Sequence, residues 1–178
     1  TAPGKSLDAY REATRLDGTD FWAWIYLARL EQSHAGQLAS ARAAAEQALE
    51  VAGDERERSV ALNDFGDVAV AEGDLGAAKA AYGEGLELAR ALSAADPASA
   101  AARRDVSVSL DRLGDVAVAE GDLGAAKAAY GEGLELARAL SAADPASAAA
   151  RRDVSVSLDR LGDVAVAEGD LGAAKAAY

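Results

Sequence analysis

The chain has 178 residues, 30 of them acidic and 18 basic, so its formal net charge is −12, and it contains no cysteine, no methionine and one histidine, His34. Without cysteine there can be no disulfide framework or thiolate metal site, and one histidine cannot build a histidine-rich metal site. The acidity argues against unspecific binding to nucleic acid or anionic lipid, which both require a basic surface. No stretch approaches the ~20 apolar residues of a membrane span. We therefore expect no cofactor, no metal, no nucleic-acid partner and no membrane partner.

An internal repeat is the strongest signal in the sequence. Residues 66–130 are identical to residues 114–178, a run of 65 residues at an offset of 48. The same register continues upstream in degraded form, where Arg56 aligns with Arg104 and Ser59 with Ser107. A period of about 20–50 residues is typical of solenoids, propellers and repeat arrays.

The first half of each repeated unit is predicted to be a helix. Its apolar residues recur at 4–3–4 spacing, which places them on one helical face: Val106, Leu110, Leu113 and Ala117. Residues 105–110 also alternate with period 2, which would suit a strand. That alternation is short and no partner strand with turn signals lies nearby, so the pattern favours a helix.

The second half of the unit is predicted to be another helix, reached through a turn at residues 120–122. Gly121 can end the first helix and Asp122 can cap the next. A second stripe then follows at Leu123, Ala126, Tyr130, Leu134, Ala137 and Leu140. Asp144-Pro145 predicts the following helix start, with Asp144 as its N-cap, and Asp96-Pro97 does the same one unit earlier. Each unit is therefore helix–turn–helix.

Together these residues resemble a tetratricopeptide repeat (TPR) array. That family's pattern of Trp, Leu and a small residue, then a glycine turn, matches Trp24, Leu27, Ala28 and Gly36, with one extra residue near His34-Ala35. The later units match at Leu113-Gly114, Gly121, Ala126, Tyr130, Gly133-Leu134 and Asp144-Pro145. The unit of 48 residues exceeds the family's usual length, so both helices must be extended.

The resemblance implies an all-α fold, a right-handed α-α superhelix of antiparallel helix hairpins. In chain order we expect the trailing helix of a preceding repeat at 1–17, a repeat at 18–53, a degenerate-to-regular repeat at 54–95, a repeat at 96–143 and a truncated repeat at 144–178. Both ends would then be open, so we expect the chain to belong to a longer array. Scarce lysine against 14 arginines is typical of a GC-rich, bacterial genome, and no targeting segment is visible, which suggests a cytoplasmic protein.

The chemistry-bearing motifs have simpler structural interpretations. Gly4-Lys5-Ser6 is similar to the tail of a phosphate-binding loop, but no strand precedes it, so it is interpreted as the entry to the first helix. His34 has no acidic or hydroxyl partner at helical spacing and is expected to be exposed. Trp22 and Trp24 cannot share a face, so Trp24 is predicted to lie in the core and Trp22 to be partly exposed. We find no catalytic constellation and expect no enzyme activity.

The helix face opposite the apolar stripe is the candidate binding surface. In TPR proteins the first helix of each repeat lines a concave groove, and the matching positions here are Asn63, Asp67, Val108, Asp111, Asp115, Val118, Val156, Asp159 and Asp163. These aspartates would repel a C-terminal carboxylate and favour a basic or mixed basic–apolar segment, with Val108 and Val156 as apolar contacts. Arg112 and Arg160 are expected at the groove edge. Charged residues opposite a core stripe also occur on faces that only contact water, and this alternative stays open.

Three functions are compatible with these observations. The first is a non-catalytic scaffold that binds a protein or peptide segment in its groove. The second is self-association into a homo-oligomer through open solenoid ends. The third is the sensor or regulatory arm of a larger bacterial signalling protein.

Overall fold

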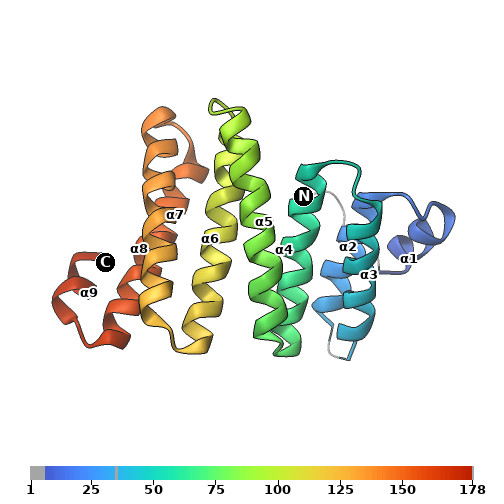
Figure 1. The fold of residues 1–178 in the computed structure, drawn as a ribbon, viewed down its shortest axis with the longest axis horizontal. Coiled ribbons are helices and arrows are strands. Elements are labelled where there is room, and N and C mark those ends of the chain that lie inside the picture. Colours follow the sequence, from blue (N-terminus) through green and yellow to red (C-terminus); the bar gives the residue numbers. More distant parts are fainter. Residues whose placement is uncertain (1–6, 35, 178) are drawn as a thin grey trace. The chain divides into compact units, whose positions relative to one another are not determined.

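The computed structural model describes residues 7–34 and 36–177, which form nine helices and no strand (Figure 1). The helices are α1 Leu7–Leu16, α2 Phe21–Gln32, α3 Leu38–Val51, α4 Glu55–Glu72, α5 Leu75–Ala95, α6 Ala100–Glu120, α7 Leu123–Ala143, α8 Ala148–Glu168 and α9 Leu171–Ala177. Residues 105–110 lie inside α6, so the helical prediction for them is confirmed and the strand alternative is wrong. Gly4-Lys5-Ser6 lies outside the described residues.

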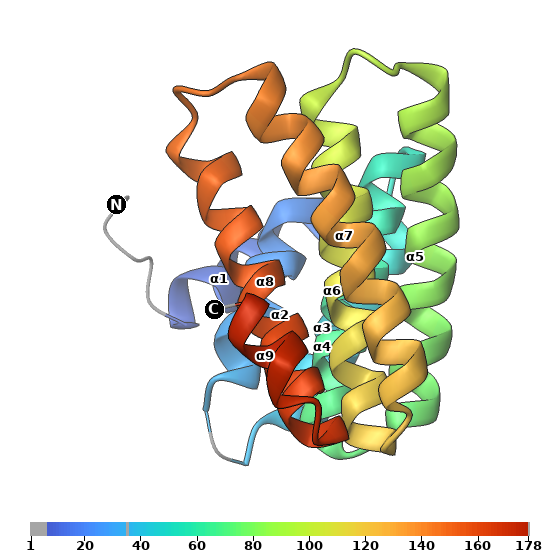
Figure 2. The same cartoon turned by 90° about the vertical axis from the view of Figure 1, so that its left-hand side faces the viewer.

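The chain divides into two compact units, residues 1–88 and 89–178, and the division falls within α5. In the first unit α2 packs against α1, α3 and α4. In the second unit α7 packs between α6 and α8, and α9 folds back along α8 (Figure 2). The predicted repeat boundaries remain a prediction.

The turn within each unit follows the predicted capping pattern. Gly121 ends α6 in the left-handed conformation, with φ of 78°, which glycine adopts without steric cost. Asp122 then caps α7, because its side chain accepts a hydrogen bond from the backbone N–H of Ala125 at 2.9 Å. The same arrangement recurs at Gly73-Asp74 and Gly169-Asp170.

The predicted N-cap at Asp144 is wrong. Asp144 follows the end of α7, and its carboxylate accepts from the N–H of Ala146 at 3.1 Å, which forms a local turn. A residue before proline is held out of the helical region, so Pro145 keeps Asp144 extended. Ser147 caps α8 instead, accepting from the N–H of Ala150 at 3.2 Å. The correction also applies to Asp96, since Ser99 caps α6.

The second unit has its core between α6, α7 and α8. Ala117, Ala126, Tyr130 and Val164 form a buried cluster, with Leu123 and Leu161 packed against it. Gly114 gives the closest approach: a methyl group added there would lie 2.3 Å from the Tyr130 ring. Gly114 and Ala126, both small residues, therefore lie where the helices meet.

Replacing Ala126 with leucine is expected to lower the free energy of unfolding by roughly 1–3 kcal/mol. Ala126 is fully buried, so the added methylene groups have no space. The repeat-equivalent Ala78, also fully buried, should respond similarly. Thermal and denaturant unfolding would measure the change, with Ala128→Leu on the exposed side of α7 as the control. Equal midpoints for Ala126→Leu and the control would contradict this packing.

The two tryptophans of the first unit lie where the sequence predicts them. Trp24 packs against both core clusters of this unit, and its indole N–H donates to the carbonyl of Gly18 at 2.9 Å. Trp22, two residues earlier, faces outward with 47% of its surface exposed. The predicted division between a core and an exposed tryptophan is confirmed.

Candidate functional site

The second unit contains most of the predicted groove residues, on two helices. Val108, Asp111, Asp115 and Val118 lie on α6, and Val156, Asp159 and Asp163 lie on α8. The structure brings Asp115, Val118 and Asp163 to one pocket. Val108, Val156 and Asp159 are not part of its lining, although Val156 is 38% exposed and Asp159 is exposed.

This pocket, which we call the α6–α8 pocket, has a volume of about 360 Å³. Its lining consists of Asp115, Val118, Leu123, Tyr130, Arg160, Asp163, Val164 and Ala167. Half of these residues are aliphatic and form an apolar wall, while the others supply two carboxylates, a guanidinium and a phenol. Pockets of roughly 300–1,000 Å³ with apolar walls and a few polar groups are typical of ligand sites.

Asp115 is held in place by two donors. The Tyr130 hydroxyl donates to its Oδ1 at 2.7 Å, and Arg160 Nη2 lies 3.2 Å from its Oδ2. The Arg160 guanidinium also sits over the Tyr130 ring, with 5.3 Å from Cζ to the ring centroid. Burial, and then the hydrogen bond to Asp115, raise the pKa of Tyr130, so its hydroxyl stays a donor at neutral pH. The Asp115 side chain nevertheless remains 52% exposed and can meet a ligand.

Asp111 lies deeper, beside the same guanidinium. Its side chain is 23% exposed, and its Oδ1 lies 3.6 Å from Arg160 Nη1, beyond hydrogen-bonding distance. Both of these atoms are buried and lack a hydrogen-bond partner in the described part of the chain. Burial raises the pKa of Asp111, and the positive charge of Arg160 partly offsets this increase. The contact between Asp111 and Arg160 is therefore a loose one.

Arg160 thus occupies the centre of the site rather than the groove edge. Its long side chain reaches from α8 to two aspartates of α6, which belong to the preceding unit of the repeat. The sequence predicted Arg160 at the groove edge and Tyr130 in the apolar stripe, but not that both contact Asp115. The signal that could have found Arg160 is the 48-residue offset, which places an arginine of one unit next to the aspartates of the unit before it.

The two predicted groove residues of the first unit have structural partners. Asn63 is buried, with 8% of its surface exposed, and its amide donates to the Ser59 carbonyl at 3.1 Å. Asp67 accepts from the Tyr82 hydroxyl at 2.7 Å, which repeats the contact between Tyr130 and Asp115. Asn63 therefore offers little surface to a ligand.

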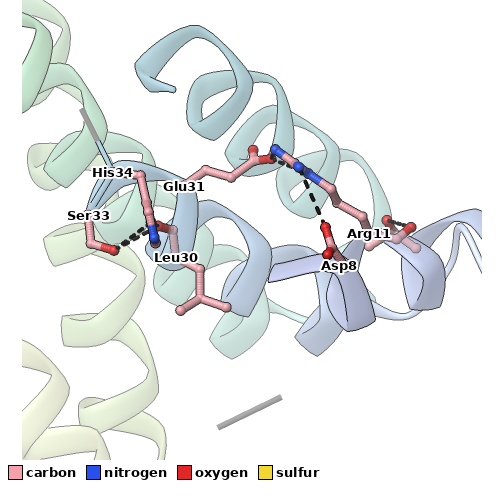
Figure 3. Close-up of polar contacts among 7 residues, drawn as sticks. Asp8, Arg11, Leu30, Glu31, Ser33 and His34 are labelled. Carbon is pink, nitrogen blue, oxygen red and sulfur yellow. Dashed lines mark hydrogen bonds and ion pairs between the residues drawn. The ribbon is translucent and has the colours of Figure 1, made fainter. Parts of the chain in front are cut away.

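Further polar contacts join α1 to α2 and lie at the end of α2 (Figure 3). Arg11 Nη2 contacts the buried Glu31 carboxylate at 2.9 Å, so this pair stabilises the helix packing. His34 is exposed, as predicted, with its Nδ1 2.6 Å from the Leu30 carbonyl oxygen and 3.2 Å from the Ser33 hydroxyl. Among the described residues no three histidines or carboxylates are grouped so as to hold a metal ion. In the same part of the chain, no helix combines the length and apolar character needed to cross a membrane.

Comparison with known proteins finds a family match in the second unit and solved structures of similar fold. The tetratricopeptide repeat pattern matches residues 109–140. No curated protein sequence matches the chain. Among solved structures, BtubC (BKLC) from P. vanneervenii is 20% identical over 96% of this chain and 68% of its own, with a TM-score of 0.76. A putative kinesin light chain from Podosopora anserina with nearly identical TPR-like repeats is 14% identical, with coverage of 96% and 81% and a TM-score of 0.65.

A third solved structure has the same fold. MamA is 15% identical over 96% of this chain and 81% of its own, with a TM-score of 0.62. These likenesses, together with the helical architecture, confirm the predicted all-α, helical-repeat superhelix as the fold class. The repeat pattern, the capped helix hairpins and the matching fold lead to one conclusion: residues 109–140 match the tetratricopeptide repeat, and the chain has the helical-repeat fold of the solved structures that it resembles.

Proposed function

We propose that this protein is a non-catalytic interaction scaffold that binds a basic–apolar peptide segment at the α6–α8 pocket. The observation that carries the proposal is the meeting of an aliphatic wall with two exposed aspartates in a hollow of about 360 Å³. The likeness to tetratricopeptide-repeat structures supports a role in protein–protein contact, and the shape and charge of the pocket support a peptide as its ligand.

An apolar side chain of the ligand would lie against Val118, which is exposed, and Leu123, which is partly exposed. Val118 is 44% exposed, so covering it would remove apolar surface from water. A neighbouring lysine or arginine of the ligand would approach Asp115 and Asp163 at the rim. The same carboxylates would repel a C-terminal carboxylate, so the pocket would favour a positively charged ligand over a negatively charged one.

We expect the binding to be weak and sensitive to salt. Asp115 is about half exposed, and its charge is already partly offset by Arg160. Interactions between exposed charges are screened over about 8 Å at physiological ionic strength. Electrostatic complementarity of this kind contributes more to selectivity and association rate than to affinity.

The direct test is to replace Val118 with lysine and measure binding of a synthetic peptide in which two arginines flank a leucine. The new ammonium group would repel the arginines and interrupt the apolar wall, so we expect affinity to fall at least about tenfold, equivalent to ~1.4 kcal/mol. Fluorescence anisotropy with a labelled peptide would report the dissociation constant.

Val166→Lys is the matched control. Val166 occupies the position in α8 that Val118 occupies in α6, is 51% exposed, and does not line the pocket. The control should bind the peptide within about twofold of the parent. Equal affinities for the two variants, or equally tight binding of a peptide with glutamates in place of the arginines, would refute the proposal. Self-association and a sensor role in a larger protein stay predictions.

A further inference from the structure

The first unit exposes a continuous group of aromatic rings on α1 and α2, which we call the aromatic cluster: Tyr10, Trp22 and Tyr26. The ring centroids of Tyr10 and Tyr26 lie 5.4 Å apart, and those of Trp22 and Tyr26 lie 6.2 Å apart. Trp22 is 47% exposed and Tyr26 is 42% exposed, whereas Tyr10 is half-buried against the core. The rings therefore form one surface rather than three separate exposed side chains.

Packing against neighbouring side chains restrains the rings of the aromatic cluster. Phe21, which is 5% exposed, meets the Trp22 indole edge-on at 5.1 Å. Tyr10 packs on the cluster of Leu27 and Ala28. Rigid, partly exposed tryptophan and tyrosine rings lose little conformational entropy on binding, and these residue types are enriched where binding energy concentrates.

The unit that carries the aromatic cluster is acidic overall, and two of its arginines have acidic partners. The nearby guanidinium of Arg29 is paired with Asp64, at 2.9 Å from Nη2 to Oδ2, and Arg11 is paired with Glu31. Residues 1–88 contain 16 acidic and 8 basic residues, so the unit as a whole attracts cations. An exposed aromatic face also attracts cations, through the negative potential above its ring.

We propose that the aromatic cluster is a second binding surface, which takes a lysine or arginine side chain of a peptide partner onto the exposed face of Trp22. The cluster already holds one cation in this way: Arg29 Cζ lies 6.0 Å from the centroid of the Tyr26 ring. Tyr26 is therefore engaged by a cation from within the chain, while Trp22 contacts the rings of Phe21 and Tyr26. This surface lies in residues 1–88, and the proposal does not rest on the α6–α8 pocket.

Indole N–H signals in a nitrogen-correlated NMR spectrum provide the test, because the chain has only two tryptophans. The probe is a short peptide with one central arginine, compared with the same peptide carrying uncharged citrulline. We expect the Trp22 signal to shift on titration with the arginine peptide, and to shift much less with the citrulline peptide. The Trp24 signal is the internal control, since its indole N–H already donates a hydrogen bond to the Gly18 carbonyl. The variant Trp22→Phe assigns the two signals.

Two variants separate this surface from the pocket. Trp22→Leu should weaken the affinity of the aromatic cluster for the arginine peptide roughly fivefold. Val118→Lys should leave the shift of the Trp22 signal unchanged. Leu16→Ala, which removes another exposed apolar side chain, is the matched control and should have no effect. Absence of a Trp22 shift with the arginine peptide, or an equal shift with citrulline, would overturn the proposal. A Trp22 shift that disappears in Val118→Lys would also overturn it, because the surface would not be independent.

Discussion

Replacing Gly114 with alanine is expected to lower the free energy of unfolding by about 1–3 kcal/mol, although alanine is the better helix former. The added methyl group would lie 2.3 Å from the Tyr130 ring, so the ring or the helix must move. Tyr130 cannot move without loss, because its hydroxyl donates to Asp115 and its ring is 3% exposed. Denaturant unfolding followed by circular dichroism would measure the change.

Gly131→Ala is the matched control for this prediction. Gly131 also lies inside a long helix, but nothing lies within 4 Å of a methyl group added there. Relief of the glycine penalty should raise the free energy of unfolding by about 0.5–1 kcal/mol. If both substitutions stabilise the protein, the close contact between Gly114 and Tyr130 is contradicted. A methyl group added at Gly66 would lie 2.3 Å from the Tyr82 ring, so Gly66→Ala should repeat the Gly114 result in the first unit.

Arg160→Met is expected to strengthen binding of the arginine–leucine–arginine peptide by about fivefold to tenfold. Arg160 lies among the carboxylates that the ligand would use, 3.2 Å from Asp115, and so acts as an internal competitor. Methionine keeps an apolar side chain over the Tyr130 ring without the charge. Fluorescence anisotropy at fixed ionic strength would measure the gain.

Two comparisons make this result interpretable. Arg138→Met changes the net charge by the same amount, but Arg138 is exposed and pairs with Glu135 outside the pocket, so its effect should be within about twofold. Helicity and the thermal midpoint of Arg160→Met should be recorded as well, because Asp111 loses its nearby cation. Unchanged or weaker binding by a folded Arg160→Met variant would show that Arg160 does not compete with the ligand.

The helices could be predicted because their signals are local. The 3–4 spacing of apolar residues located α6 and α7, and Gly121-Asp122 located the turn between them. Asp144 was misjudged because two local roles compete there: an aspartate before proline can cap a helix or close a turn on itself. Here its carboxylate closes the turn onto Ala146, and Ser147 becomes the cap.

Only the part of the candidate site that lies on one face of a single helix could be predicted from the sequence. Helical geometry correctly placed Asp115 and Val118 on a common exposed side of α6. The position of Arg160 depends on the register between α6 and α8, which no local pattern encodes. Asn63 shares the predicted face but is buried, and a methyl group added at Gly85 would lie 3.7 Å from its amide oxygen. Contacts between helices therefore decided which predicted residues reach the pocket.

The most direct test of the proposed function is a methyl NMR titration of the parent protein with the arginine–leucine–arginine peptide. We predict that the methyl signals of Val118 and Leu123 shift together, and that these shifts become smaller as salt is added, while the signals of Val166 stay in place. A titration in which the Val118 and Leu123 methyl signals do not shift, or shift equally with the glutamate peptide, would contradict binding of a basic–apolar segment at the α6–α8 pocket.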